Sequence, residues 1–142
     1  GSAVVEIYQN CNVFNDGAFE DLTNKATKAE TTIRLEHGKP LIFGADKKKG
    51  IRLRGLEPEV VTLGENGITE RDLLVWDEKA PTLAFMMASL GSEFPVPLGV
   101  FRAVERPVHH ELELEQQHAV TAQRGEGDIA KLLHAGDTWT IE

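Results

Sequence analysis

The chain has 142 residues, enough for one domain with a single core, and its 41% hydrophobic and 27% charged residues match the average of folded proteins. This composition excludes a disordered chain, a fibrous repeat and a disulfide scaffold. Fifteen Lys+Arg against 23 Asp+Glu give a formal charge of −8, the wrong sign for a protein that neutralises nucleic-acid phosphates. We therefore expect no nucleic-acid partner.

Hydropathy and cysteine content predict the cellular setting. No apolar run reaches the roughly 18–20 residues that a membrane helix needs, so we expect no membrane span. Cys11 is the single cysteine and cannot form an internal disulfide. We therefore expect a reducing, cytoplasmic environment.

The first residues predict a strand that belongs to a larger sheet. Gly1-Ser2 is typical of the scar left when a purification tag is cleaved, and residues 3–8 form an apolar segment rich in β-branched side chains. Such a strand needs partners on both hydrogen-bonding edges. We therefore expect the sequence to be the end of a longer protein whose other strands lie upstream.

The middle of the chain predicts a short helix and several strands. Asn15 and Asp16 are candidate N-caps for a helix at about residues 17–25. Alternating, β-branched segments predict five short strands at residues 31–36, 41–43, 51–54, 60–63 and 73–77. The turn residues His37 to Pro40 between the first two predict a β-hairpin.

The last third predicts three helices and two short strands. Pro81 opens a helix that ends near Gly91, with Met86 and Met87 as core residues rather than a binding site. The remaining predicted elements are an edge strand at 95–101, a polar helix from Pro107 to Gly125, a short helix at 129–133 capped by Gly136, and a strand at 137–142 with Trp139 packed. The predicted fold class is therefore α+β, a hairpin-rich antiparallel sheet with about four helices.

No complete active site follows from the motifs. The nucleophile elbow and the two common glycine-rich nucleotide loops are absent from the sequence. The acidic stretch from His109 to His118 lacks the paired spacing of a metal motif, so we assign no metal there. Cys11 is either a small buried hydrophobic residue or a thiolate that faces a cofactor, and alone it supplies one of the four thiolates of an iron–sulfur cluster.

The sequence around Cys11 resembles a known family. The string Val5-Glu6-Ile7-Tyr8-Gln9-Asn10-Cys11-Asn12-Val13-Phe14-Asn15-Asp16-Gly17-Ala18-Phe19 resembles the β subunit of 2-oxoacid:ferredoxin oxidoreductases, most closely the 2-oxoglutarate type. Later similar strings are Leu35-Glu36-His37-Gly38-Lys39-Pro40-Leu41, Pro81-Thr82-Leu83-Ala84-Phe85, Pro97-Leu98-Gly99-Val100-Phe101-Arg102 and Val104-Glu105-Arg106-Pro107. The resemblance covers nearly the whole chain after residue 2 and matches the C-terminal region of that subunit.

The resemblance implies a role and a domain division. Residues 3–15 would form the last strand and cluster-cysteine loop of a truncated thiamine-binding α/β domain, and residues 16–142 the C-terminal domain. Cys11 would be a cofactor-binding and metal-binding residue, one ligand of a [4Fe–4S] cluster in the full-length subunit, close to Tyr8, Asn12, Asn15 and Asp16. No residue of the chain is assigned as catalytic.

The resemblance also implies cofactors and partners. The complete enzyme would use thiamine diphosphate, Mg²⁺ and a [4Fe–4S] cluster in the oxidative decarboxylation of a 2-oxo acid to acyl-CoA with reduction of ferredoxin. Its partners would be an α subunit, a second β subunit, ferredoxin and coenzyme A. We expect the excised chain to be inactive and to hold none of these cofactors.

A second hypothesis is a stand-alone protein-interaction module without catalytic activity. If an acidic ferredoxin binds this part of the subunit, the expected basic patch comprises Lys47, Lys48, Lys49, Arg52 and Arg54.

Overall fold

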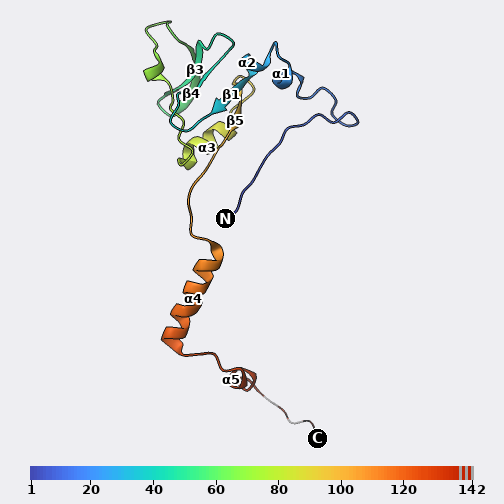
Figure 1. The fold of residues 1–142 in the computed structure, drawn as a ribbon, viewed down its shortest axis with the longest axis vertical. Coiled ribbons are helices and arrows are strands. Elements are labelled where there is room, and N and C mark those ends of the chain that lie inside the picture. The colour runs from blue at the N-terminus through green and yellow to red at the C-terminus, as the bar shows by residue number, and fades with distance from the viewer. Residues whose placement is uncertain (138, 140, 142) are drawn as a thin grey trace. The chain divides into compact units, whose positions relative to one another are not determined.

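The computed structural model describes residues 1–137, 139 and 141 (Figure 1). The described residues form two compact units. Val5–Val104 is the larger unit and holds the strands, whereas Gly1–Val4 and the chain from Glu105 onward form the smaller one.

The larger unit combines short helices with two small sheets. Its helices are α1 (Glu20–Thr23), α2 (Lys28–Thr31) and α3 (Pro81–Ala88), with a 3₁₀ turn η1 at Glu70–Asp72. Its strands are β1 (Thr32–Leu35), β2 (Ile42–Phe43), β3 (Lys49–Arg54), β4 (Glu57–Thr62) and β5 (Val96–Gly99). An antiparallel sheet has the order β2-β3-β4, and β1 pairs with β5 in parallel. The predicted α+β class is confirmed.

The strands predicted at residues 51–54 and 60–63 are confirmed, and β3 and β4 are longer than predicted and pair as a hairpin (Figure 1). Its register runs from Lys49↔Thr62 to Arg54↔Glu57, so only two residues connect the strands. Gly55, the first of them, has φ +68°, a conformation that suits a tight connection and that glycine adopts without a steric penalty.

The predicted hairpin of residues 31–43 is wrong. Its turn exists, because Lys39 N–H donates to the Glu36 carbonyl at 3.0 Å. Beyond the turn, however, Trp76 N–H donates to the Lys39 carbonyl at 2.9 Å, and Gly38 N–H donates to the Trp76 carbonyl at 2.8 Å. The chain therefore pairs with the segment around Trp76 instead of returning along β1, which takes β5 as its parallel neighbour.

The segment predicted as a strand at residues 73–77 is extended but makes only an isolated bridge, Pro40↔Val75. Leu74 nevertheless connects two elements, since its N–H donates to the Ile51 carbonyl and its carbonyl accepts from Leu41 N–H. The segment thus fills the space beside β3 without forming a ladder of its own.

The core of the larger unit surrounds Trp76, whose side chain is fully buried. Its indole N–H donates to the Val100 carbonyl at 3.0 Å, and its ring meets Phe101 edge-on at 6.5 Å between centroids. The other buried members of this cluster are Ile33, Leu35, Leu41, Phe43, Ile51 and Met87. The core role of Met87 is confirmed, and Pro81 stands at the start of α3 as expected.

The beginning of the chain departs from the predictions. Residues 4–7 form no strand, and Val4 is 98% exposed. A strand needs a hydrogen-bonding partner, and none of the described strands pairs with this segment. The predicted helix at 17–25 is reduced to α1, because Gly17 has φ +75° and the Asp16 side chain accepts from Asn10 instead of capping a helix.

The smaller unit contains the two predicted C-terminal helices, α4 (His109–Arg124) and α5 (Ile129–Leu133). Gly125 ends α4 with φ +83°, as expected, whereas His134 rather than Gly136 caps α5. Thr138, Thr140 and Glu142 of the predicted final strand lie outside the described residues, and Trp139 is exposed rather than packed. No helix in the described part of the chain is long and apolar enough to cross a membrane.

The parallel pairing of β1 with β5 requires a glycine at position 99. Gly99 has φ +137°, and a Cβ there would lie 2.6 Å from the Leu35 carbonyl oxygen. We expect Gly99→Ala to destabilise the protein by about 2 kcal/mol, because the backbone strain and the steric overlap add. Thermal unfolding measures this change. Gly127→Ala, at a position where a Cβ meets nothing within 4 Å, is the control, and equal effects of both substitutions would contradict the expectation.

Glu30 at the end of α2 fixes the turn between β2 and β3. Its carboxylate accepts from Lys49 Nζ and from Ala45 N–H, each at 2.8 Å, and these bonds, the one from Lys49 foremost, lower the pKa of Glu30. A lowered pKa in the folded state stabilises the protein above the usual glutamate pKa, and this stabilisation disappears as the pH falls through the folded value.

We therefore expect Glu30→Gln to lower the melting temperature at pH 7 and to have progressively less effect as the pH falls below about 4.3. Melting curves from pH 3 to 7 measure this difference. Glu6→Gln, in the exposed N-terminal segment, is the control. A Glu30→Gln effect that stays constant over this pH range would show that the ion pair does not contribute.

Candidate functional site

Cys11 lies in a closed turn between the exposed N-terminal residues and α1. Asn15 N–H donates to the Cys11 carbonyl at 2.9 Å, and the two residues form an isolated antiparallel bridge. Asn12, Val13 and Phe14 make the turn between them. The Cys11 side chain is half-buried in this chain. It is therefore not a fully buried hydrophobic residue, which was the first of the two alternatives for Cys11.

The turn directs main-chain donors at the sulfur. Hydrogen bonds from the backbone of Phe14 and then Val13 lower the pKa of the Cys11 thiol, with a smaller contribution from Asn15. Desolvation acts in the opposite direction and is outweighed. The lowered pKa therefore favours a thiolate, the form that binds metal.

The side chain of Asn10 closes the turn from outside. Its Oδ1 accepts from Gly17 N–H at 2.8 Å, and its Nδ2 donates to Asn12 Oδ1 and Asp16 Oδ1, both at 2.8 Å. Asn12 and Asp16, which the sequence placed near Cys11, therefore stabilise the turn through their hydrogen bonds with Asn10.

The other residues expected near Cys11 have different contacts. Tyr8 packs its ring against Phe19, with 5.1 Å between centroids, and so supports the base of the turn. Asn15 contributes through its main chain. Sequence analysis missed Asn10 and the N–H groups of Val13 and Phe14. The available signal was the Asn-Cys-Asn string, whose first amide can both donate and accept.

Cys11 fits an iron–sulfur cluster as one ligand among several. Its side chain is partly exposed and the backbone of the turn lowers its pKa, both of which suit a cluster cysteine. Within residues 1–137, 139 and 141, no group of three or more His, Cys, Asp or Glu side chains is arranged to hold a metal ion.

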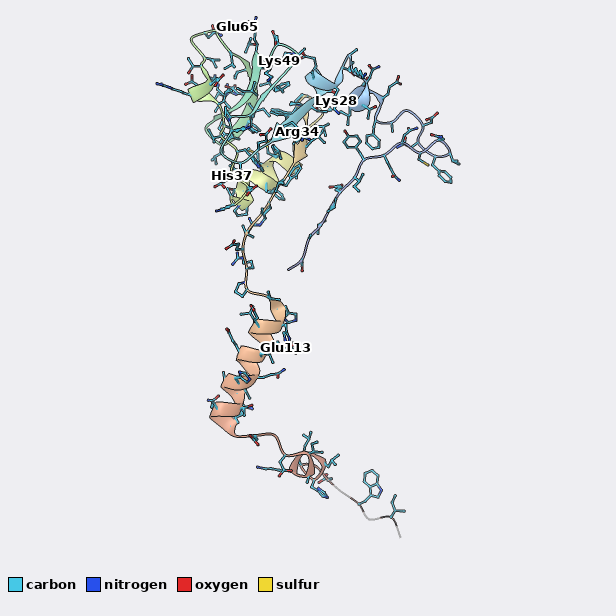
Figure 2. The ribbon with its side chains drawn as sticks, in the orientation of Figure 1. Lys28, Arg34, His37, Lys49, Glu65 and Glu113 are labelled. Carbon is cyan, nitrogen blue, oxygen red and sulfur yellow. The ribbon has the colours of Figure 1, made fainter. Side chains whose placement is uncertain are left out.

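The expected basic patch, which lies on β3 and the turn before it, is largely neutralised. Lys49, labelled in Figure 2, pairs with Glu30, and Arg52 pairs with Glu59. The remaining pairs of the patch are Lys48 with Asp46, and Arg54 with Glu57 and Glu59. Four of its five cations thus face carboxylates, which leaves little net positive charge for an acidic partner.

The whole chain is similar to one part of a known enzyme subunit. It is 33% identical over 148 aligned positions to the 2-oxoglutarate oxidoreductase subunit KorB of Mycobacterium tuberculosis. The resemblance to 2-oxoglutarate oxidoreductases is confirmed. The alignment includes all of this chain but only 39% of the relative's length. Neither a protein-family model nor a solved structure matches the chain.

The relative is more than twice as long as this chain. The exposed, β-branched residues 4–7 and the accessible Cys11 turn both lie in the first part of the chain.

The main-chain donors around Cys11 predict an acidic thiol. We expect the rate of Cys11 alkylation by iodoacetamide to rise with pH around a midpoint below that of the unfolded chain, because the lowered pKa maintains the reactive thiolate at lower pH. Cys11 is the single cysteine, so the signal is specific. The chain unfolded in guanidinium provides the reference midpoint.

Asn10→Ala tests the turn itself and should move the midpoint toward that of the unfolded chain. Asn24→Ala removes a local bond to Ala26 N–H and serves as the control. Equal midpoints for the folded and unfolded wild-type chain would contradict the expectation.

Proposed function

We propose that this chain is the C-terminal part of the β subunit of a 2-oxoglutarate:ferredoxin oxidoreductase. The observation that carries this proposal is the 33% identity over the whole chain to a 2-oxoglutarate oxidoreductase subunit. It favours an enzyme subunit over the stand-alone interaction module. In this proposal residues 3–15 end the thiamine-binding domain, residues 16–142 form the C-terminal domain, and the enzyme is cytoplasmic.

Cys11 is the residue through which the chain takes part in electron transfer. Its thiolate would hold one iron of a [4Fe–4S] cluster, and the N–H groups of Val13, Phe14 and Asn15 would donate to the sulfur. Such hydrogen bonds stabilise the additional negative charge of the reduced cluster and so raise its reduction potential.

The cofactors supply chemistry that these residues do not perform. When bound, thiamine diphosphate with Mg²⁺ supplies the carbanion chemistry for decarboxylation of the 2-oxo acid, and the cluster supplies one-electron transfer toward ferredoxin. The chain's own contribution is one thiolate, a fixed turn and surfaces for other subunits. The partners we propose are an α subunit, a second β subunit, ferredoxin and coenzyme A.

The decisive experiment replaces Cys11 in the full-length subunit assembled with its α subunit. We expect Cys11→Ser to reduce the cluster content and the rate of ferredoxin reduction by at least tenfold, because a hydroxyl is a poor ligand for iron. Thiamine diphosphate binding should stay unchanged. Iron and sulfide analysis, visible absorption and calorimetric titration with thiamine diphosphate measure these quantities.

A matched control separates the position of the thiol from its mere presence. The double variant with Cys11→Ser and Ser92→Cys restores one thiol at an exposed position outside the Cys11 turn. It should remain as deficient in cluster as Cys11→Ser. A full cluster content and normal ferredoxin reduction in Cys11→Ser would exclude Cys11 as a ligand.

A further inference from the structure

The outer edge of β4 has free main-chain groups. β4 is the last strand in the order β2-β3-β4, and no described strand pairs with its outer side. Its residue Val60 is in register with Ile51 of β3. Ile51 donates its N–H to the Leu41 carbonyl at 3.0 Å and accepts at its carbonyl from Leu74 N–H at 2.8 Å. Ile51 and Val60 therefore form a non-hydrogen-bonded pair, and the N–H and C=O of Val60 point to the outer edge.

A groove of about 660 Å³ runs along this edge. One wall is β4 from Glu57 to Val60. The residues of the other wall belong to the end of α3 and the loop after it, and they are Met86, Ser89, Leu90, Gly91, Glu93 and Phe94. Four successive residues of a strand point alternately to its two faces. Since all four line the groove, it follows the edge of the sheet and not one face.

One side of the groove is apolar. Val60 shares its face of the sheet with the buried Ile51, and it is 41% exposed. Across the groove, Met86, Leu90 and Phe94 are partly buried and pack against the core. An alternating strand beside β4 would therefore place every second side chain against apolar atoms.

The other side of the groove is acidic. Glu57 and Glu59 occupy the face opposite to Val60, and Glu93 lies in the loop of the facing wall. The groove's described lining contains no lysine or arginine. Glu59 is neutralised by Arg52 and Arg54 of β3, whereas the exposed Glu57 makes only a loose pair with Arg54 at 3.9 Å, and Glu93 pairs with no cation among the described residues. Glu57 and Glu93 are therefore the carboxylates that a segment beside β4 would meet.

We propose that the outer edge of β4 binds an extended segment of a partner protein as an additional strand, in which apolar residues alternate with lysine or arginine. Val60 supplies the main-chain hydrogen bonds, the wall of Met86, Leu90 and Phe94 accepts the apolar side chains, and Glu57 attracts the basic ones. Pro58 has no N–H, which keeps the pairing short. The exposed strand-like residues 5–8 of a second copy are a poor occupant because they carry Glu6 and no cation.

The test uses the full 142-residue chain labelled with ¹⁵N and a blocked hexapeptide of three Lys-Val repeats. We expect the amide resonance of Val60 and those of the α3 wall to shift, and the corresponding Glu-Val peptide to bind at least tenfold more weakly. Reversing both exposed charges, Glu57→Lys with Glu93→Lys, should weaken Lys-Val binding roughly fivefold to tenfold. Glu65→Lys is the matched control, because Glu65, labelled in Figure 2, is exposed and does not line the groove.

A second variant tests the main-chain pairing directly. Val60→Pro removes the outward N–H, leaves the hydrogen-bonded pairs of β3 and β4 in place, and should reduce peptide binding at least tenfold with an unchanged circular dichroism spectrum. Three results would overturn the proposal: shifts that map away from β4, equal binding of the Glu-Val peptide, or failure of both peptides to bind at millimolar concentration. A dimer of the chain that buries Val60 would also overturn it, in favour of a second copy as the occupant.

Discussion

The larger unit depends on how Trp76 is held. Its main chain pairs with the turn after β1, through Gly38 and Lys39, and its indole N–H donates to the Val100 carbonyl just after β5. One residue thus joins three segments that are distant in sequence. The ring is fully buried, and loss of such a side chain typically costs about 3–5 kcal/mol. Because the two sheets share no strand in the described chain, contacts of this kind hold them on one core.

Elements that depend on local signals could be predicted from the sequence, whereas pairings between distant segments, such as those of Trp76, could not. The hairpin of β3 and β4, the start of α3 and the end of α4 follow local signals, namely Gly55, Pro81 and Gly125. The pairing of β1 with β5 has no local signal, because its strands are far apart in the sequence and Gly99 is the single residue that indicates a close approach. The expected hairpin after β1 failed for this reason: its turn was correct, but Trp76 provided a better partner than β1 for the chain that follows.

At the candidate site, the sequence indicated Cys11 as a candidate ligand, which stays a prediction, and it did not indicate the contacts around Cys11. The string around Cys11 indicated a cluster cysteine through its resemblance to a family, and the whole-length match supports that resemblance. The donors that lower the pKa of Cys11 are backbone N–H groups, which every residue except proline carries, so side-chain identity could not reveal them. The bonds of Asn10 to Asn12, Asp16 and Gly17 likewise depend on the turn geometry and not on spacing.

The distribution of charge limits where an acidic electron carrier can bind. The formal charge of −8 opposes such a partner, but charges more than about 8 Å apart are largely screened at physiological salt, so the local patches at the contact decide the encounter. The cations of β3 face Glu30, Glu57 and Glu59, so the segment richest in lysine and arginine carries little excess positive charge. In the proposed enzyme, a ferredoxin would therefore be attracted mainly by surfaces outside β3. The edge of β4, with Glu57 and Glu93 beside it, instead suits the basic segment proposed above.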